Sequence, residues 1–147
     1  MAYWILKTDA DVYPFDQLER ERRTVWDGVT NAVALKHIRG MAPGDRAFIY
    51  HSNVGKELVG LARITSAPYA DPKRDDPRLM VVDLEADRRL PQPVSLAAIK
   101  ADPGFAGLGL VRMPRLSVVP VPAEQWERLL EMSGLEGPSG RPERGEA

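Results

Sequence analysis

The chain contains no cysteine, and this absence excludes several kinds of chemistry at once. Disulfides, thiolate zinc sites, iron–sulfur clusters and cysteine nucleophiles all need a thiol group. Histidine is scarce, so His37 and His51 are the two imidazoles available for acid–base work near neutral pH. Long apolar runs are also missing, since no stretch approaches the roughly 18 residues of a membrane-spanning helix. We therefore expect no membrane association.

An excess of charge of either sign is missing too. The 147 residues include 20 Lys and Arg against 21 Asp and Glu, which leaves a formal net charge of −1. This balance excludes a polybasic protein that holds phosphates by bulk electrostatics, so any nucleic-acid role must depend on a local site. Residues 1–4 show no basic leader followed by an apolar run, which predicts a cytoplasmic location, or a nuclear one in a eukaryote.

The length fits one domain, and the composition changes near the C-terminus. Residues 134–147 contain four glycines and two prolines, with Leu135 and Ala147 as the apolar residues. Such a segment buries too little apolar surface to offset the entropy lost on ordering. We expect a single domain over 1–133, a disordered tail over 134–147, and a monomer.

Short strand patterns dominate the domain. Runs of β-branched and aromatic residues predict strands at 3–6, 46–51, 57–65, 80–85 and 116–119. Apolar spacing predicts helices at 14–18, 32–39, 96–100 and 122–133. Asn31 is a suitable N-cap for the second helix, and Gly60 inside a strand predicts a bulge or a tight bend. The expected fold is α+β, a mixed, partly open β-barrel of about five to six strands with short peripheral helices.

Motifs of known enzyme classes are absent. The chain has no nucleophile elbow, no phosphate loop and no paired-histidine helix. Asp71, Asp75 and Asp76 cluster in one stretch, but the interleaved Lys73 and Arg74 favour a solvated loop over a metal site. We expect no metal, no cofactor and no catalytic residue.

Two segments are candidates for ligand binding. Trp26 precedes Gly28 in a segment that leads into the helix after Asn31, so a flat stacking surface adjoins helix N–H donors suited to a phosphate. The second segment, 50–53, supplies hydroxyl, imidazole and amide groups that can read the edge of a planar heterocycle. The residues alone leave open the plainer interpretations, a buried core tryptophan beside a helix cap and an ordinary approach to a hairpin turn. Together the segments predict an aromatic-walled pocket with convergent polar groups.

Several separated motifs occur in the order found in one known family. They are Tyr3-Trp4-Ile5-Leu6-Lys7, Trp26-Asp27-Gly28-Val29, Phe48-Ile49-Tyr50-His51-Ser52-Asn53, Val59-Gly60-Leu61-Ala62, Arg115-Leu116-Ser117-Val118-Val119-Pro120-Val121 and a closing helix with Trp126. The sequence thereby resembles the EVE-domain family over about residues 2–134. This resemblance implies a PUA-like fold, a mixed barrel related to YTH and ASCH domains.

The resemblance also implies a function. EVE domains are associated with nucleic acids that carry a modified base, either modified cytosine in DNA or a modified base in RNA. The base would be flipped into an aromatic pocket, because a stacked base hides its modification. Extrusion costs only a few kcal/mol, and base–aromatic stacking of about 1–3 kcal/mol offsets much of it. The implied activity is recognition without catalysis.

Carried onto this sequence, the resemblance implies a set of site residues. Those expected at the base pocket are Trp26, Asn31, Tyr50, His51, Ser52, Asn53, Thr8 and Ser117. Independently of the resemblance, four cations would contact phosphates if they share one face, and are otherwise scattered solvated charges: Arg22, Arg23, Lys36 and Arg39. The chain departs from the family in two places: Thr8-Asp9-Ala10 replaces the common Ser-Glu-Pro, and Thr30-Asn31-Ala32-Val33-Ala34 replaces Arg followed by Asn-Tyr-Gln-Ala. The second change removes an arginine suited to a phosphate and a tyrosine suited to packing or stacking.

Two other functions remain as alternatives at this point. One is a small enzyme acting on a nucleotide or RNA, with His51 as its acid or base. The other is a protein-interaction module that uses an exposed apolar face.

Overall fold

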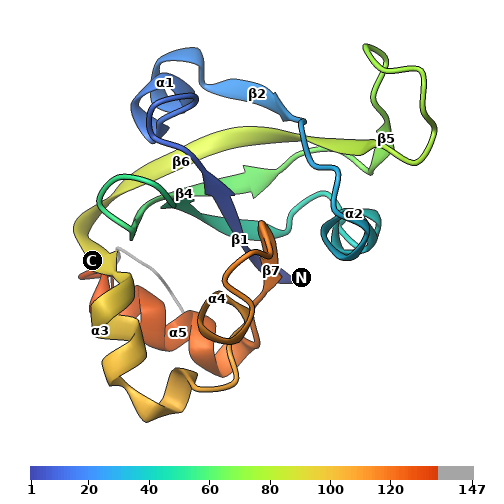
Figure 1. The fold of residues 1–147 in the computed structure, drawn as a ribbon. Coiled ribbons are helices and arrows are strands. Elements are labelled where there is room, and N and C mark those ends of the chain that lie inside the picture. Colours follow the sequence, from blue (N-terminus) through green and yellow to red (C-terminus); the bar gives the residue numbers. More distant parts are fainter. Residues whose placement is uncertain (136–147) are drawn as a thin grey trace.

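The computed structural model describes residues 1–135, in which short helices surround one strongly curled sheet (Figure 1). The elements are β1 (Tyr3–Thr8), α1 (Phe15–Glu21), β2 (Arg23–Trp26), α2 (Ala32–Arg39), β3 (Arg46–His51), β4 (Glu57–Ile64), β5 (Tyr69–Ala70), β6 (Met80–Ser95), α3 (Leu96–Ala101), a short 3-10 helix (Pro103–Phe105), α4 (Gly109–Arg112), β7 (Val118–Pro120) and α5 (Ala123–Met132). The predicted α+β class, a mixed and partly open barrel with short peripheral helices, is confirmed.

The strands follow the order β2-β6-β4-β3-β1-β7, and β5 pairs with β6 beside this path. β1 and β3 run parallel, with Thr8 opposite His51, and the other pairs are antiparallel. The long β6 crosses the sheet below β2 in Figure 1 and pairs with both β2 and β4. In Figure 1 the C-terminal end of β1 points toward α1, the next element of the chain.

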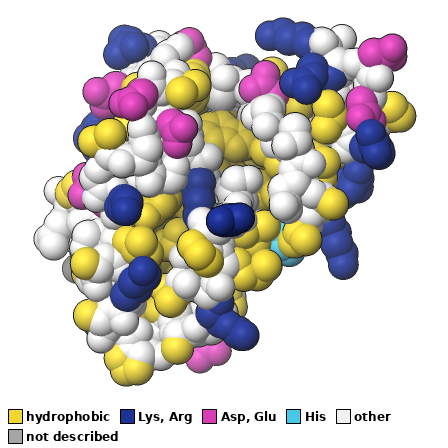
Figure 2. Space-filling model, in the orientation of Figure 1, with side chains coloured by type: hydrophobic (Ala, Val, Ile, Leu, Met, Phe, Trp, Pro, Cys, Tyr) yellow, Lys and Arg dark blue, Asp and Glu magenta, His cyan; other side chains and the backbone are white. Residues whose placement is uncertain are grey.

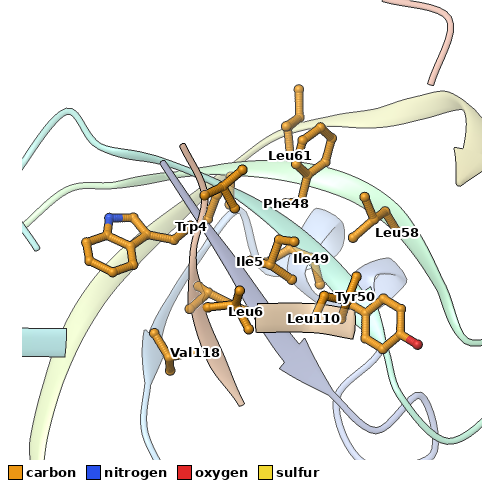
Figure 3. Close-up of a cluster of buried hydrophobic side chains, with 14 of the residues drawn as sticks. Trp4, Ile5, Leu6, Phe48, Ile49, Tyr50, Leu58, Leu61, Leu110 and Val118 are labelled. Carbon is orange, nitrogen blue, oxygen red and sulfur yellow. The ribbon is translucent and has the colours of Figure 1, made fainter. Parts of the chain in front are cut away.

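Apolar residues of β1 and β3 form the centre of the core. Ile5, Leu6 and Phe48 have no exposed surface, as their positions in central strands require. In Figure 3 these side chains lie together with others from β4, α4 and β7, such as Leu58 and Val118. Burial of this apolar surface, at about 25 cal/mol per Å², supplies the main free energy that stabilises the curled sheet around these side chains.

Gly60 marks the irregular part of the sheet, as its place in a strand predicted. The register shifts between Leu58 and Gly60 in the pairing of β4 with β6, and opposite Gly60 in the pairing of β4 with β3. The ring of Phe15, the first residue of α1, fills the space where a side chain at position 60 would stand. The bulge thus lets α1 lie directly against the strand.

Two strand assignments from the sequence need correction. Residues 23–26, expected to be loop or turn, form β2, and β6 continues from the predicted 80–85 as far as Ser95. The extension was missed because its exposed positions carry charged residues that are not typical of strands. Asp87, for example, lies near Arg46 and Arg63 of the neighbouring strands at 3.8 and 3.7 Å.

The core extends slightly beyond the predicted domain end. Leu135 is 6% exposed, belongs to the core, and donates its backbone N–H to the Leu130 carbonyl at 2.8 Å. Gly134 makes this turn with a φ of 86°, a conformation that glycine adopts without strain. The domain therefore reaches at least residue 135, and the rest of the predicted tail, 136–147, lies outside the described residues. Within 1–135 no helix is both long and apolar enough to cross a membrane.

The Phe15–Gly60 contact generates a stability prediction. A Cβ at position 60 would lie 2.3 Å from the Phe15 ring, so Gly60→Ala should lower the free energy of unfolding by about 1–3 kcal/mol or more through overpacking. Gly107→Ala is the matched control, because a Cβ there meets no atom within 4 Å. Urea unfolding of both variants measures the difference. Equal stability of the two variants would contradict the assigned contact.

Candidate functional site

A cavity of about 740 Å³ opens beside the C-terminal end of β1. Its lining comes from the ends of β1 and α1, from residues 12–13 between them, from β2, from the segment 27–31, and from the single residues Lys73 and Ser117. In Figure 2 it is the hollow with hydrophobic side chains at its base, in the upper middle of the molecule. Its volume is within the roughly 300–1,000 Å³ typical of sites for small organic ligands.

Two aromatic rings form one wall of the cavity. Trp26, the last residue of β2, is 7% exposed and packs edge-on against Tyr13, with 6.2 Å between ring centroids and 79° between ring planes. Edge-to-face packing of this kind is favourable and fixes both rings. Val12 and Val29 add apolar surface to the same lining. Trp26 thus belongs to the core, as the plainer interpretation of the sequence had it, and the small part that remains exposed lines the cavity together with Tyr13.

Hydrogen bonds hold the Tyr13 ring in place. Its hydroxyl donates to Glu21 Oε1 at 2.6 Å, while the Gln17 amide donates to Glu21 Oε2 at 3.1 Å. Burial and the bond to Glu21 raise the pKa of Tyr13 to about 12, and the same bond lowers the pKa of Glu21. Tyr13 therefore stays a neutral phenol and Glu21 a carboxylate across the physiological range.

Polar groups of β1 and of the residue before β7 also line the cavity. Thr8 Oγ1 donates to the Tyr13 carbonyl at 3.0 Å, and Lys7 Nζ donates to the Pro114 carbonyl at 2.9 Å. Burial lowers the pKa of Lys7. Ser117 accepts the Lys7 backbone N–H at 3.0 Å through its carbonyl, and its hydroxyl has no partner among residues 1–135. That hydroxyl is available to a ligand.

Asn31 joins the cavity to the start of α2. Its Oδ1 accepts the backbone N–H groups of Val33 and Ala34 at 2.9 and 3.1 Å, so the predicted N-cap is confirmed. The carboxamide oxygen is thereby committed to the helix. The Nδ2 group has no acceptor within the described part of the chain, and it remains as a donor at the cavity wall.

The structure places the segment 50–53 outside the cavity. Tyr50 is buried in the core at 3% exposure, below the Lys7 ammonium at 5.9 Å from its ring. His51 Nε2 accepts the backbone N–H of Phe15 at 3.1 Å. None of the four residues of this segment is among the lining residues, although the sequence predicted that they would supply its hydrogen bonds.

Ser52 and Asn53 instead fasten the loop that leads to the cavity wall. Ser52 Oγ donates to Asp9 Oδ1 at 2.9 Å. Asn53 Nδ2 donates to Asp11 Oδ2 at 2.8 Å, and its Oδ1 accepts the Ala10 N–H at the same distance. The physical reason is the parallel pairing of β1 with β3, which sets the residues after both strands side by side. These residues position the loop before Tyr13.

The four predicted phosphate-binding cations are dispersed, and within residues 1–135 none of them lines the cavity. Arg22 donates to the Ala86 carbonyl at 3.2 Å, and Arg23 lies 3.6 Å from the Glu85 carboxylate. Arg39 donates to the Arg78 carbonyl at 2.9 Å. Lys36 is exposed on α2.

Sequence reasoning missed Tyr13, Lys7, Glu21 and Lys73, which also line the cavity. A useful signal existed for Lys7, which closes the first of the family motifs. For Tyr13 none existed, because its approach to Trp26 depends on the docking of α1. His51, the candidate acid or base, uses Nε2 to accept a backbone N–H, and no three acidic or histidine side chains in 1–135 gather as a metal site requires.

Comparison with known proteins identifies the family. A family model described as the EVE domain matches residues 2–132. The chain belongs to the EVE-domain family. This finding confirms the sequence resemblance and the PUA-like fold that it implied.

Relatives and solved structures match this chain along almost its whole length. Rpa0253 from Rhodopseudomonas palustris is 44% identical with a TM-score of 0.87, and the match covers 92% of this chain and 94% of that one. Thymocyte nuclear protein 1 of Rattus norvegicus is 28% identical over 91% of this chain and 74% of its own length. The human THYN1 protein, solved in complex with 5-methylcytosine containing DNA, has a TM-score of 0.81 at 24% identity, covering 90% of this chain and 98% of that one.

The contact between His51 and Phe15 generates a pH prediction. Burial lowers the pKa of His51, so the folded protein binds a proton there less readily than the unfolded chain, whose histidine keeps its ordinary pKa near 6.5. Stability is therefore complete above that pKa and is lost as the pH falls toward the lowered one. Urea unfolding from about pH 7.5 to 5.5 should show this decline.

His51→Gln should reduce that decline. His37, whose pKa is also lowered by burial, contributes with the same sign, so His37→Gln is the matched control and the double variant should remove most of the slope. A slope in His51→Gln equal to that of the wild type would show that the imidazole is not held neutral by the Phe15 N–H.

Proposed function

We propose that this EVE domain is a non-enzymatic, monomeric module that binds nucleic acid and holds one modified base, flipped out of its strand, in the Trp26 cavity. The observation that carries the proposal is the cavity of about 740 Å³ with an aromatic wall and unpartnered polar groups around it. The human THYN1 protein in complex with 5-methylcytosine containing DNA supports modified cytosine in DNA as the ligand class.

Stacking supplies the affinity for the extruded base. A base laid against the Trp26 indole gains about 1–3 kcal/mol, which offsets most of the few kcal/mol that unstacking costs. Tyr13 meets Trp26 nearly at a right angle, so its ring closes the end of the slot in which the base lies. Val12 and Val29 give a methyl substituent an apolar surface to contact.

Hydrogen bonds supply the choice of base. The Ser117 hydroxyl and the Asn31 Nδ2 group can donate to ring acceptors. The carboxylates of Glu21 and Asp27, both at the cavity, can accept from an exocyclic amino group such as that of cytosine. Donors therefore lie on the side of β7 and α2, and acceptors lie on the side of α1 and β2. This separation suits a base whose edge carries both kinds of group.

Two substitutions test the proposal. Trp26→Leu keeps an apolar side chain but removes the stacking face, so affinity for a duplex with one 5-methylcytosine should fall by about one to two orders of magnitude. Ser117→Ala should reduce it about fivefold, the equivalent of one hydrogen bond of about 1 kcal/mol. Fluorescence anisotropy with matched methylated and unmethylated duplexes measures both effects.

Ser66→Ala is the control for the serine substitution, because Ser66 lies outside the cavity, where its hydroxyl accepts the Asp83 N–H. Thermal unfolding verifies that each variant is folded at the binding temperature. The proposal would be refuted if the wild type bound both duplexes with equal affinity and if Trp26→Leu, in a folded protein, left that affinity unchanged.

The balance of charge predicts a weak dependence of binding on salt. With 20 basic and 21 acidic residues the chain has no bulk attraction for DNA, so we expect two to four phosphate contacts and a log–log salt slope between about −2 and −4. Titrations between 50 and 200 mM NaCl measure this slope. A slope steeper than about −6 would be incompatible with recognition centred on one cavity.

A further inference from the structure

Acidic residues are missing from two long stretches of a chain that is otherwise balanced in charge. The first stretch, 28–44, and the second, 103–123, contain no Asp or Glu. Their charged residues are Lys36 and Arg39 in the first and Arg112 and Arg115 in the second. A balanced total therefore hides a local excess of positive charge wherever these two stretches lie together.

The structure brings the two stretches together next to the cavity. A hollow of about 320 Å³ is lined by Asn31 and Val33 from the first and by residues 113–116 from the second. Asn31 also lines the Trp26 cavity, so the hollow continues the cavity along the surface. In Figure 2 the surface below the cavity carries dark blue and yellow side chains.

We name this surface the acid-free face and define it by five exposed residues: Val33, Lys36, Arg112, Met113 and Arg115. Lys36 stands one helical turn after Val33 and so shares its side of α2. The Lys7 ammonium reaches the same face through its bond to the Pro114 carbonyl. Val33 and Met113 leave 43% and 48% of their surface exposed, so the face mixes apolar contact area with cations.

The cations of the acid-free face have no acidic partner within residues 1–135. Arg112, Arg115 and Lys36 form no ion pair there, whereas Arg63 of β4 and Arg89 of β6 each pair with two carboxylates. Arginines without a carboxylate partner keep their guanidinium forks available for phosphate, which they bind through two parallel hydrogen bonds.

The opposite rim of the cavity has the reverse character. Glu21 and Asp27 line the cavity on that side, and Asp9 and Asp11 stand on the loop that leads to Tyr13. Carboxylates repel phosphates at close range, so a DNA strand gains nothing by crossing this rim. A strand that inserts a base into the cavity can avoid this repulsion by passing over the acid-free face.

We propose that the acid-free face binds the DNA backbone next to the flipped base. Arg112 and Arg115 bind its phosphates, and Lys36 lies at the edge of the surface over which the strand passes. This inference rests on the proposed function, and it assigns the phosphate contacts to a different place than Arg22 and Arg23. Neither of those two lines the cavity or its neighbouring hollow: Arg23 lies beside Glu85, and Arg22 donates to the Ala86 carbonyl.

The test compares two charge-matched double variants. Arg112→Gln/Arg115→Gln should lower affinity for methylated and unmethylated duplexes by the same factor, about tenfold or more at low salt, and make the log–log salt slope shallower by about 2. Arg20→Gln/Arg88→Gln removes two exposed arginines that form no ion pair within residues 1–135, and it should change neither quantity. Thermal unfolding verifies that both variants are folded.

The readouts separate this inference from the proposed function. The ratio of affinities for the two duplexes reports on the cavity and should be unchanged in Arg112→Gln/Arg115→Gln, while the salt slope reports on the face. If the salt slope of that variant equals that of the wild type, or if the control variant changes by the same amount, the acid-free face does not bind the phosphates. This conclusion holds even if the protein prefers methylated DNA. A wild type without preference refutes the modified-base proposal, and the slopes still decide the face. Binding confined to an RNA oligonucleotide overturns both.

Discussion

The contact of the Phe15 ring with the bare Cα of Gly60 sets the distance between α1 and the sheet. Any side chain at position 60 would occupy the space of the ring, which has no exposed surface. The bulge at this point keeps the strand paired on both sides while it admits the ring. Since Tyr13 precedes α1 and Glu21 ends it, the aromatic wall and one acidic rim of the cavity both depend on this contact.

A second set of contacts fixes the same helix from its N-terminal side. The His51 imidazole accepts the first N–H of α1, which would otherwise lack a partner, and Ser52 and Asn53 bind the preceding loop. The core contact determines how closely α1 approaches the sheet, and these polar contacts hold the segment before it. A polar run at the end of a strand therefore stabilises the cavity without entering it.

The sequence predicted the elements better than the site, for a physical reason. Strand patterns, the Asn31 cap and the irregularity at Gly60 are encoded by residues close in the chain, so local reasoning finds them. Trp26, Asn31, Thr8 and Ser117 come from distant segments, and the structure gathers them around one cavity.

The segment 50–53 was placed at the cavity because its residue types fit a ligand. The type of a side chain shows what it can bind, but the neighbouring segment decides what it does bind. Here the neighbour is the loop after β1, brought there by a parallel strand pairing that no local pattern reveals. Tyr13 was missed for the same reason, because it meets Trp26 only once α1 has docked.

The net charge of the sequence likewise does not show where the charged side chains lie on the folded protein. Glu85 and Asp87 of β6 lie beside arginines of β2, β3 and β4 and neutralise them. Carboxylates that are paired there do not neutralise cations elsewhere on the surface. The net charge of the chain is therefore close to zero although the surface around Arg112 and Arg115 is positively charged. Such a patch is too small to steer DNA over distances beyond the Debye length of about 10 Å. It acts only after contact, which leaves discrimination between bases to the cavity and the orientation of the bound strand to the arginines.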